Sequence, residues 1–314
     1  DVVAITGTAV GTYNNKNVAS ATSVTFSGLS LNNSNYSLTI QSPASATITA
    51  KALTMSGLSV AANKVYNGTT SATVSGTAAL QSAEAVGTGT TSDGKPYTGD
   101  TVAITGSAVG TYDNKDVSSA TSVTFSGLSL NNSNYSLTIQ SPAAATITAK
   151  ALTMSGLTAS ASKVYDGTTS AAVSGTATLL SAEAVGAGTT ADGKPYTGDT
   201  VAITGTAIGT YNSKDVASAT TVTFSGLSLN NSNYLLTVQS PASATITTKA
   251  LTMSGLTVSA SKIYDGTTTA TVSGIAALLV DEAVGTGTTA DGKPYTGDVV
   301  AITGTAVGTY NNKN

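Results

Sequence analysis

The side chains of this 314-residue chain that could do chemistry are few, and they recur at a constant spacing. The most regular group is Lys-Val-Tyr-Asp-Gly-Thr at 163–168, which returns as Lys-Val-Tyr-Asn-Gly-Thr at 64–69 and Lys-Ile-Tyr-Asp-Gly-Thr at 262–267. A tyrosine beside a carboxylate suits a metal or sugar site. A strand that ends in a tight turn explains the same residues, because Asp, Asn and Gly favour turns for backbone reasons. The pattern favours the turn, with the tyrosine covering the core.

Three carboxylates in the middle copy suggest a second kind of site. Asp192, Asp199 and Asp215 could meet at one end of a β-sandwich and bind calcium. Calcium takes about six to eight oxygen ligands, usually with several carboxylates close together. These three are dispersed along the chain and stand beside turn glycines or lysines, so we expect no metal site and no cofactor.

Each copy carries a single glutamate, at Glu84, Glu183 and Glu282. A buried glutamate paired with a lysine and an asparagine could promote an intramolecular isopeptide bond, as in some surface-fibre domains. The sequence does not show which lysine or asparagine would be its partner. Glycosylation acceptor patterns at Asn32, Asn35 and Asn67 are of the kind that a chain rich in Asn, Ser and Thr produces by chance.

The composition argues against most catalytic and nucleic-acid-binding classes. The chain has no histidine and no cysteine, so the usual base of a serine hydrolase and the usual zinc ligands are missing. Only 9% of residues are charged and the net charge is −3, so no basic face for nucleic acid is expected. No apolar run reaches the length of a membrane helix, and no membrane insertion is expected. We expect a protein that is not an enzyme.

Apolar residues alternate with Ser and Thr through most of the chain, as in residues 22–27 (Thr-Ser-Val-Thr-Phe-Ser) and 36–41 (Tyr-Ser-Leu-Thr-Ile-Gln). Period-two patterns with β-branched residues predict half-buried strands. Clusters of turn formers separate them, such as Asp93-Gly94-Lys95-Pro96. Short strands with a turn every 8–12 residues or so predict antiparallel, immunoglobulin-like β-sandwiches.

The repeat period is 99 residues, which suits one domain per copy. Residues 1–17 return unchanged at 298–314, which suggests a higher-order period within a longer array; chance identity of two copies is the alternative. Alternation continues without a Gly, Pro or charge cluster from 145 to 154, which predicts units joined without flexible linkers into a rod.

The ordered set of motifs resembles the YDG-type repeat of bacterial filamentous-haemagglutinin-like exoproteins, large surface proteins secreted by the two-partner route. The matching pieces of one copy lie at 150–153, 163–169, 198–201, 209–216, 222–229, 233–237 and 244–249. Asn67 departs from the Tyr-Asp-Gly pattern, and since Asn forms turns as well as Asp, the departure favours a structural role. In the phase of this family, we expect complete units at 51–149 and 150–248, the back part of a unit at 1–50 and the front part of another at 249–314. The resemblance implies an extracellular location and a stalk or adhesive fibre. It does not imply a ligand.

Two functions follow as expectations. The first is a structural stalk segment of a secreted bacterial surface protein, an adhesin or biofilm-matrix filament, that spans distance and resists force when its terminal strands are sheared together. Its partners would be neighbouring repeats, with lateral or end-to-end self-association into fibres. The second is a repeated glycan- or surface-binding module that presents turns such as Asn131-Asn132-Ser133-Asn134. The absence of cysteine fits a secreted chain, because a secreted protein benefits from having no thiol that could be oxidised or cross-linked.

Overall fold

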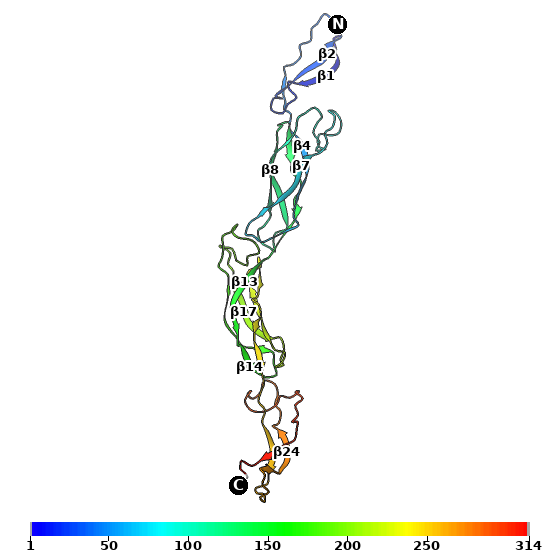
Figure 1. Ribbon diagram of the computed structural model, residues 1–314. Helices are drawn as coiled ribbons and strands as arrows, with labels where there is room; N and C mark the ends of the chain where they lie inside the picture. Colours follow the sequence, from blue (N-terminus) through cyan, green and yellow to red (C-terminus); the bar gives the residue numbers. More distant parts are fainter. Residues whose placement is uncertain (1, 313–314) are drawn as a thin grey trace. The chain divides into compact units, whose positions relative to one another are not determined.

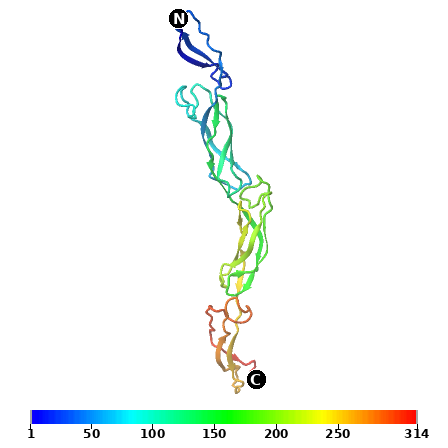
Figure 2. The same cartoon turned by 180° about the vertical axis from the view of Figure 1, so that it is seen from behind.

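The computed structural model describes residues 2–312. The regular secondary structure of these residues consists of β-strands, with no helix. Among these residues no helix could cross a membrane. The chain divides into two compact units, Asp1–Ala149 and Lys150–Asn314. Each unit holds one complete 99-residue repeat and one partial repeat. Figure 1 labels strands in both units, and Figure 2 shows them from behind.

The strands of the two complete repeats correspond one to one. In the first unit they are β4 (Lys51–Val60), β5 (Asn63–Val65), β6 (Ser71–Ala72), β7 (Val74–Leu80), β8 (Ile104–Tyr112), β9 (Ser122–Leu130), β10 (Tyr135–Thr138), β11 (Ala143–Ala144) and β12 (Thr146–Thr148). In the second unit they are β13 (Lys150–Ala159), β14 (Ser162–Val164), β15 (Ser170–Ala171), β16 (Val173–Leu179), β17 (Ile203–Tyr211), β18 (Thr221–Leu229), β19 (Tyr234–Thr237), β20 (Ala242–Ser243) and β21 (Thr245–Thr247).

Each complete repeat is a β-sandwich, as the alternation predicts. In the first unit the sheet β10-β4-β7 packs on the sheet β11-β9-β8-β6. Met55 and Leu58 from β4 meet Phe125 from β9 in the core, surrounded mostly by Val, Leu, Ile and Ala. The second unit repeats this arrangement around Met154, Leu157 and Phe224. The predicted tandem β-sandwich fold is confirmed.

The antiparallel description needs one addition, because the first two strands of each repeat pair in parallel with two strands from its C-terminal part. β10 runs alongside the start of β4, with Tyr135 opposite Lys51, and β12 runs alongside β5. β19 with β13 and β21 with β14 repeat this in the second unit. The chain therefore enters a repeat at the end that holds β10 and leaves it at the opposite end, beside β5.

A bulge at a glycine keeps the longest strand in phase with the core. In β4 the side chains of Lys51, Leu53 and Met55 are buried, and the next buried residue is Leu58, three positions later. The pairing of β4 with β7 shifts between Ser56 and Leu58, around Gly57. The extra residue returns the following apolar side chains to the core face.

The two partial repeats have smaller sheets. Residues 1–50 form β1 (Ile5–Tyr13), β2 (Ser23–Leu31) and β3 (Ala44–Ser45), which make one sheet. Residues 249–314 contribute β22 (Met253–Val258), β23 (Thr269–Ala270), β24 (Val272–Leu278) and β25 (Gly308–Thr309). Their apolar side chains lack a complete second sheet, so Ile5, Val10 and Ile275 are exposed.

Candidate functional site

The first residue of each repeat is a lysine whose side chain lies inside the protein. Alternation along β4 places Lys51 on the same face as Leu53 and Met55, so the sheet carries it toward the core. Lys51 is 8% exposed and Lys150 is fully buried. A buried ammonium must be paired, because its desolvation is expensive.

Two carboxylates complete a buried group that we call the Lys–Glu–Asp triad. Lys51 Nζ lies 2.7 Å from Glu84 Oε1 and 2.9 Å from Asp93 Oδ1. The other copies repeat it, with Lys150 at 2.9 Å from both Glu183 and Asp192, and Lys249 at 2.9 Å from Glu282 and 3.1 Å from Asp291. All three glutamates of the chain thus lie beside a buried lysine, with an aspartate in place of the asparagine that the sequence suggested.

The loop between β7 and β8 positions both carboxylates. Backbone pairing of Glu84 with Tyr97 fixes the loop's two limbs, and a hydrogen bond from Thr54 N to Gly94 O ties it to β4. Gly89 passes so close that a Cβ there would overlap Glu84 Oε2 and Asp93 Oδ2. These two oxygens therefore converge next to Gly89.

The triad is electrostatically matched. Burial lowers the pKa of Lys51, but its hydrogen bonds to Glu84 and Asp93 outweigh burial, so the pKa stays above its usual value. The backbone N–H of Lys95 and the Lys51 ammonium hold the pKa of Asp93 well below its usual range. The Tyr97 ring covers the lysine, with its centroid 4.1 Å from Nζ, which adds a cation–π contact. The triad is therefore a buried group of paired charges.

The Tyr-Asp-Gly segment forms the turn that its sequence favours. Asp166 Oδ1 accepts hydrogen bonds from the N–H and the hydroxyl of Thr168, both at 2.9 Å. Lys163 Nζ lies 2.6 Å from the same oxygen and donates to the carbonyl oxygens of Thr168 and Ser170. Gly167 follows at φ 75°, a backbone conformation that favours glycine. The carboxylate therefore closes a local turn.

The carboxylates considered for calcium are not brought together. Asp192 belongs to the triad, Asp199 accepts a hydrogen bond from the Tyr234 hydroxyl at 2.6 Å, and Asp215 pairs with Lys214 at 2.8 Å. Within residues 2–312 no group of three or more acidic, His or Cys side chains is placed to hold a metal ion.

Family comparison connects these features to a known domain. The model of the YDG domain matches residues 49–145 and 148–244, more than half of the chain. The chain belongs to the YDG domain family. No curated protein and no solved structure matches it. The two matches cover all but the last four residues of each complete repeat, 51–149 and 150–248. They include the Lys–Glu–Asp triad and the Tyr-Asn-Gly or Tyr-Asp-Gly turn of each.

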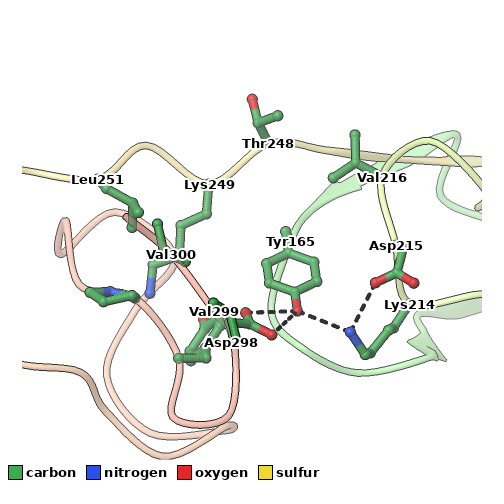
Figure 3. Close-up of a pocket in the computed structure, with 12 residues that line it drawn as sticks. Tyr165, Lys214, Asp215, Val216, Thr248, Lys249, Leu251, Asp298, Val299 and Val300 are labelled. Carbon is green, nitrogen blue, oxygen red and sulfur yellow. Dashed lines mark hydrogen bonds and ion pairs between the residues drawn. The ribbon is translucent and has the colours of Figure 1, made fainter. Parts of the chain in front are cut away.

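The tyrosine of the YDG turn has a second role at the joint between repeats inside the second unit. The Tyr165 hydroxyl lies 3.0 and 2.9 Å from the carboxylate oxygens of Asp298, which belongs to the following partial repeat. Lys214 also reaches this hydroxyl, and it pairs with Asp215 (Figure 3). Burial and the Asp298 carboxylate raise the pKa of Tyr165. The hydroxyl is therefore a neutral donor that links two YDG repeats.

A cleft of about 380 Å³ opens at this joint. Its walls combine polar and apolar side chains from both repeats, among them Tyr165, Lys214, Lys249, Leu251, Asp298 and Val300 (Figure 3). The triad lysine of the following repeat, Lys249, therefore lies at the base of the joint. The structure places the buried ion pair next to the point where one YDG repeat continues into the next.

The first unit has a joint of the same kind, built from the asparagine turn. Asn134 Oδ1 accepts a hydrogen bond from Val18 N at 2.8 Å, and Asn134 Nδ2 donates to Asn17 Oδ1 at 2.9 Å. Asn132 closes the turn through the N–H of Asn134. In this copy the turn that the sequence offered as a glycan-binding surface holds the preceding partial repeat.

The sequence pointed to the glutamates of the triad, missed the lysine, and offered the aspartate of the second repeat, Asp192, only as a calcium ligand. A signal for the lysine was present, because Lys51 is in phase with Leu53 and Met55 and so belongs to the buried face. Asp93 carries no such signal, since Asp-Gly-Lys-Pro reads equally well as an exposed turn. Only the folded loop brings Asp93 back to β4.

Proposed function

We propose that this chain is a tension-bearing stalk segment of a secreted bacterial surface protein of the filamentous-haemagglutinin-like kind, with no catalysis on an external substrate. The parallel pairing of β4 with β10 and of β5 with β12 carries the proposal. Chain entry and exit lie at opposite ends of a repeat. The first strand, β4, is hydrogen-bonded to β10, and the last strand, β12, is hydrogen-bonded to β5. Pulling shears all bonds of such a pair at once, rather than opening them one at a time.

The joints support the same function. Tyr165 with Asp298, and Asn134 with Val18, bond successive repeats to each other without a Gly/Ser-rich linker. A chain built of such repeats spans distance with few flexible points. An adhesive filament or biofilm matrix is the setting in which this property is useful, and lateral pairing of exposed strand edges would extend it into bundles.

Single-molecule pulling of the full chain tests the proposal. We expect two high-force events, one for each complete YDG repeat. The partial repeat at 249–314 is the internal control, because among the described residues β22 pairs only with β24 and has no parallel partner strand. It should extend first and at low force. Complete repeats that open at the same low force as this control would contradict the proposal.

The location is tested separately. Expression of the parent gene product with an epitope in a described loop away from the triads, such as 32–35, should give surface labelling on intact cells. Labelling only after permeabilisation would contradict a surface stalk. Binding of the full chain on a glycan array would instead favour the adhesive-module alternative, with the cleft beside Tyr165 as its first candidate surface.

A further inference from the structure

The Lys–Glu–Asp triad has an arrangement that a simple ion pair does not need. The lysine nitrogen lies within hydrogen-bond distance of both carboxylates, and the second oxygens of Glu84 and Asp93 converge near Gly89. Glu84 therefore touches both the amine and the Asp93 carboxyl group. We propose that each triad forms an intramolecular isopeptide bond, between Lys51 Nζ and Asp93 Cγ in the first repeat, with Glu84 carrying the proton.

The reaction is a condensation that needs no oxidant or co-reactant. A proton first moves from the lysine ammonium to the aspartate carboxylate by way of Glu84, which gives an amine and a carboxylic acid. Nζ then attacks Cγ, and a C–N bond forms. Glu84 accepts a proton from the nitrogen and returns it to the departing hydroxyl. The C–O bond breaks, and one water leaves.

The surroundings of Asp93 suit the tetrahedral intermediate. The N–H of Lys95 donates to Oδ1 at 3.0 Å and the N–H of Thr90 donates to Oδ2 at 3.1 Å. Fixed backbone donors stabilise negative charge that develops on a carbonyl oxygen. The same two donors recur at Asp192 and at Asp291. The hydrogen bonds of the ion pair oppose the first proton transfer, because they raise the pKa of Lys51 and lower that of Asp93. Burial of the lysine acts in the other direction, because a low dielectric disfavours the charged form. Convergence of the three side chains in one buried group is therefore what favours the reaction.

The other lysine–aspartate pairs show what is special about the triads. Lys214 and Asp215 lie 2.8 Å apart, but their side chains are 47% and 62% exposed, against 0% and 19% for Lys150 and Asp192. Neither Lys214–Asp215 nor Lys163–Asp166 has a glutamate beside it, since every glutamate of the chain belongs to a triad. Contact between lysine and aspartate is therefore common here, and the buried glutamate is the added element.

Intact mass spectrometry of the purified full chain tests the proposal. The expected mass is below the sequence mass by three waters, one for each triad. After trypsin digestion, cleavage after Lys51 should be absent, and a branched peptide should join the Lys51 and Asp93 segments. A full-chain mass equal to the sequence mass would overturn the proposal. A branched peptide that joins Lys51 to Glu84 would overturn the assignment of the acceptor.

The variants Glu84→Gln and Asp93→Ala should each restore one water, while the triads of Lys150 and Lys249 keep their deficits. These two triads show that the rest of the chain is folded even where the first repeat is disturbed. Asp215→Ala is the matched control, because it removes an aspartate from a lysine that has no glutamate, and it should leave the mass deficit at three waters. A full deficit in Glu84→Gln would overturn the proton-carrying role.

Discussion

One side-chain atom distinguishes the Tyr-Asn-Gly turn of the first complete repeat from its counterparts. Asn67 holds Lys64 as Asp166 holds Lys163, with its Oδ1 2.8 Å from the lysine nitrogen, but Asn67 carries no charge. Burial lowers the pKa of Lys64. The turn of this repeat therefore keeps its hydrogen bonds and loses its ion pair.

The variant Asn67→Asp should restore that pair and stabilise the turn by about 1 kcal/mol at neutral pH, since a hydrogen bond to a charged group exceeds a neutral one. Hydrogen exchange of the β5 amides measures the gain. The equivalent carboxylate at Asp265 has its pKa lowered to about 2 by its hydrogen bond with Lys262 and by the N–H of Thr267.

That direction fixes the pH dependence of the gain. A carboxylate whose folded pKa is lowered stabilises the protein above the pKa of the unfolded chain, and the stabilisation is lost as the pH falls toward the folded pKa. The gain from Asn67→Asp should therefore be complete above about pH 4 and disappear near about pH 2. Asp166→Asn, as the reverse change, should destabilise its own repeat over the same range. A gain that does not depend on pH would contradict the ion-pair explanation.

At the scale of the strand, glycines with positive φ decide where the register shifts. Gly156 (φ 98°) interrupts β13 where its pairing with β16 shifts, between Ser155 and Leu157. A Cβ on Gly156 would overlap the carbonyl oxygen of Thr176 on the partner strand. Both the backbone conformation and the close approach of β16 require glycine here.

Gly156→Ala should therefore cost more than strain alone. Gly186 supplies a matched control, because it has φ 84° and a Cβ added there would have no heavy atom within 4 Å. We expect Gly186→Ala to cost about 1 kcal/mol for the backbone conformation. Gly156→Ala should cost roughly 2 kcal/mol more, because the strands must move apart. Urea unfolding of the full chain measures both, and equal costs would show that the overlap is relieved without loss of pairing.

At the scale of the whole molecule, the joints between repeats are the feature that connects one folded domain to the next. Tyr165 forms the joint in the second unit and the YDG turn in the same stretch of chain, so one residue contributes to folding within a repeat and to contact with the next. Its ring also lies 5.9 Å from that of Tyr295, tilted by 59°. The joint therefore combines a charge-assisted hydrogen bond with aromatic contact.

Tyr165→Phe keeps the ring and removes the hydrogen bond to Asp298. We expect the backbone amide of Asp298, which donates to Tyr295 O, to exchange with solvent up to about tenfold faster, since the lost bond contributes on the order of 1 kcal/mol. Tyr310→Phe is the control, because its hydroxyl donates to Ser259 O within the partial repeat. Unchanged exchange at Asp298 in Tyr165→Phe would mean that ring packing alone holds the joint.

The amino-acid sequence by itself determined the local features of this protein. Alternation of apolar residues with Ser and Thr is a property of neighbouring residues, so it predicted β2 from residues 22–27. Residues 36–41, which were also predicted as a strand, form none in this partial repeat. Their equivalents form β10 and β19 in the complete repeats, where β4 and β13 lie alongside. Asp166 and Gly167 closed the expected turn because their preferences act over a few residues. The constant spacing of such features also determined the 99-residue period of the repeats, because each copy repeats the same local signals.

Only the tertiary structure decided the pairing of β4 with β10 and the meeting of Lys51 with Asp93. Both contacts join segments that are far apart in the chain. Each forms only when burial of a shared core offsets the entropy cost of closing the loop between the segments. Period-two alternation shows which face of a strand is buried but not which strand lies beside it. It likewise placed Lys51 on the buried face without showing which carboxylates would neutralise it. The proposed cross-link depends on the identity of those carboxylates, Glu84 and Asp93.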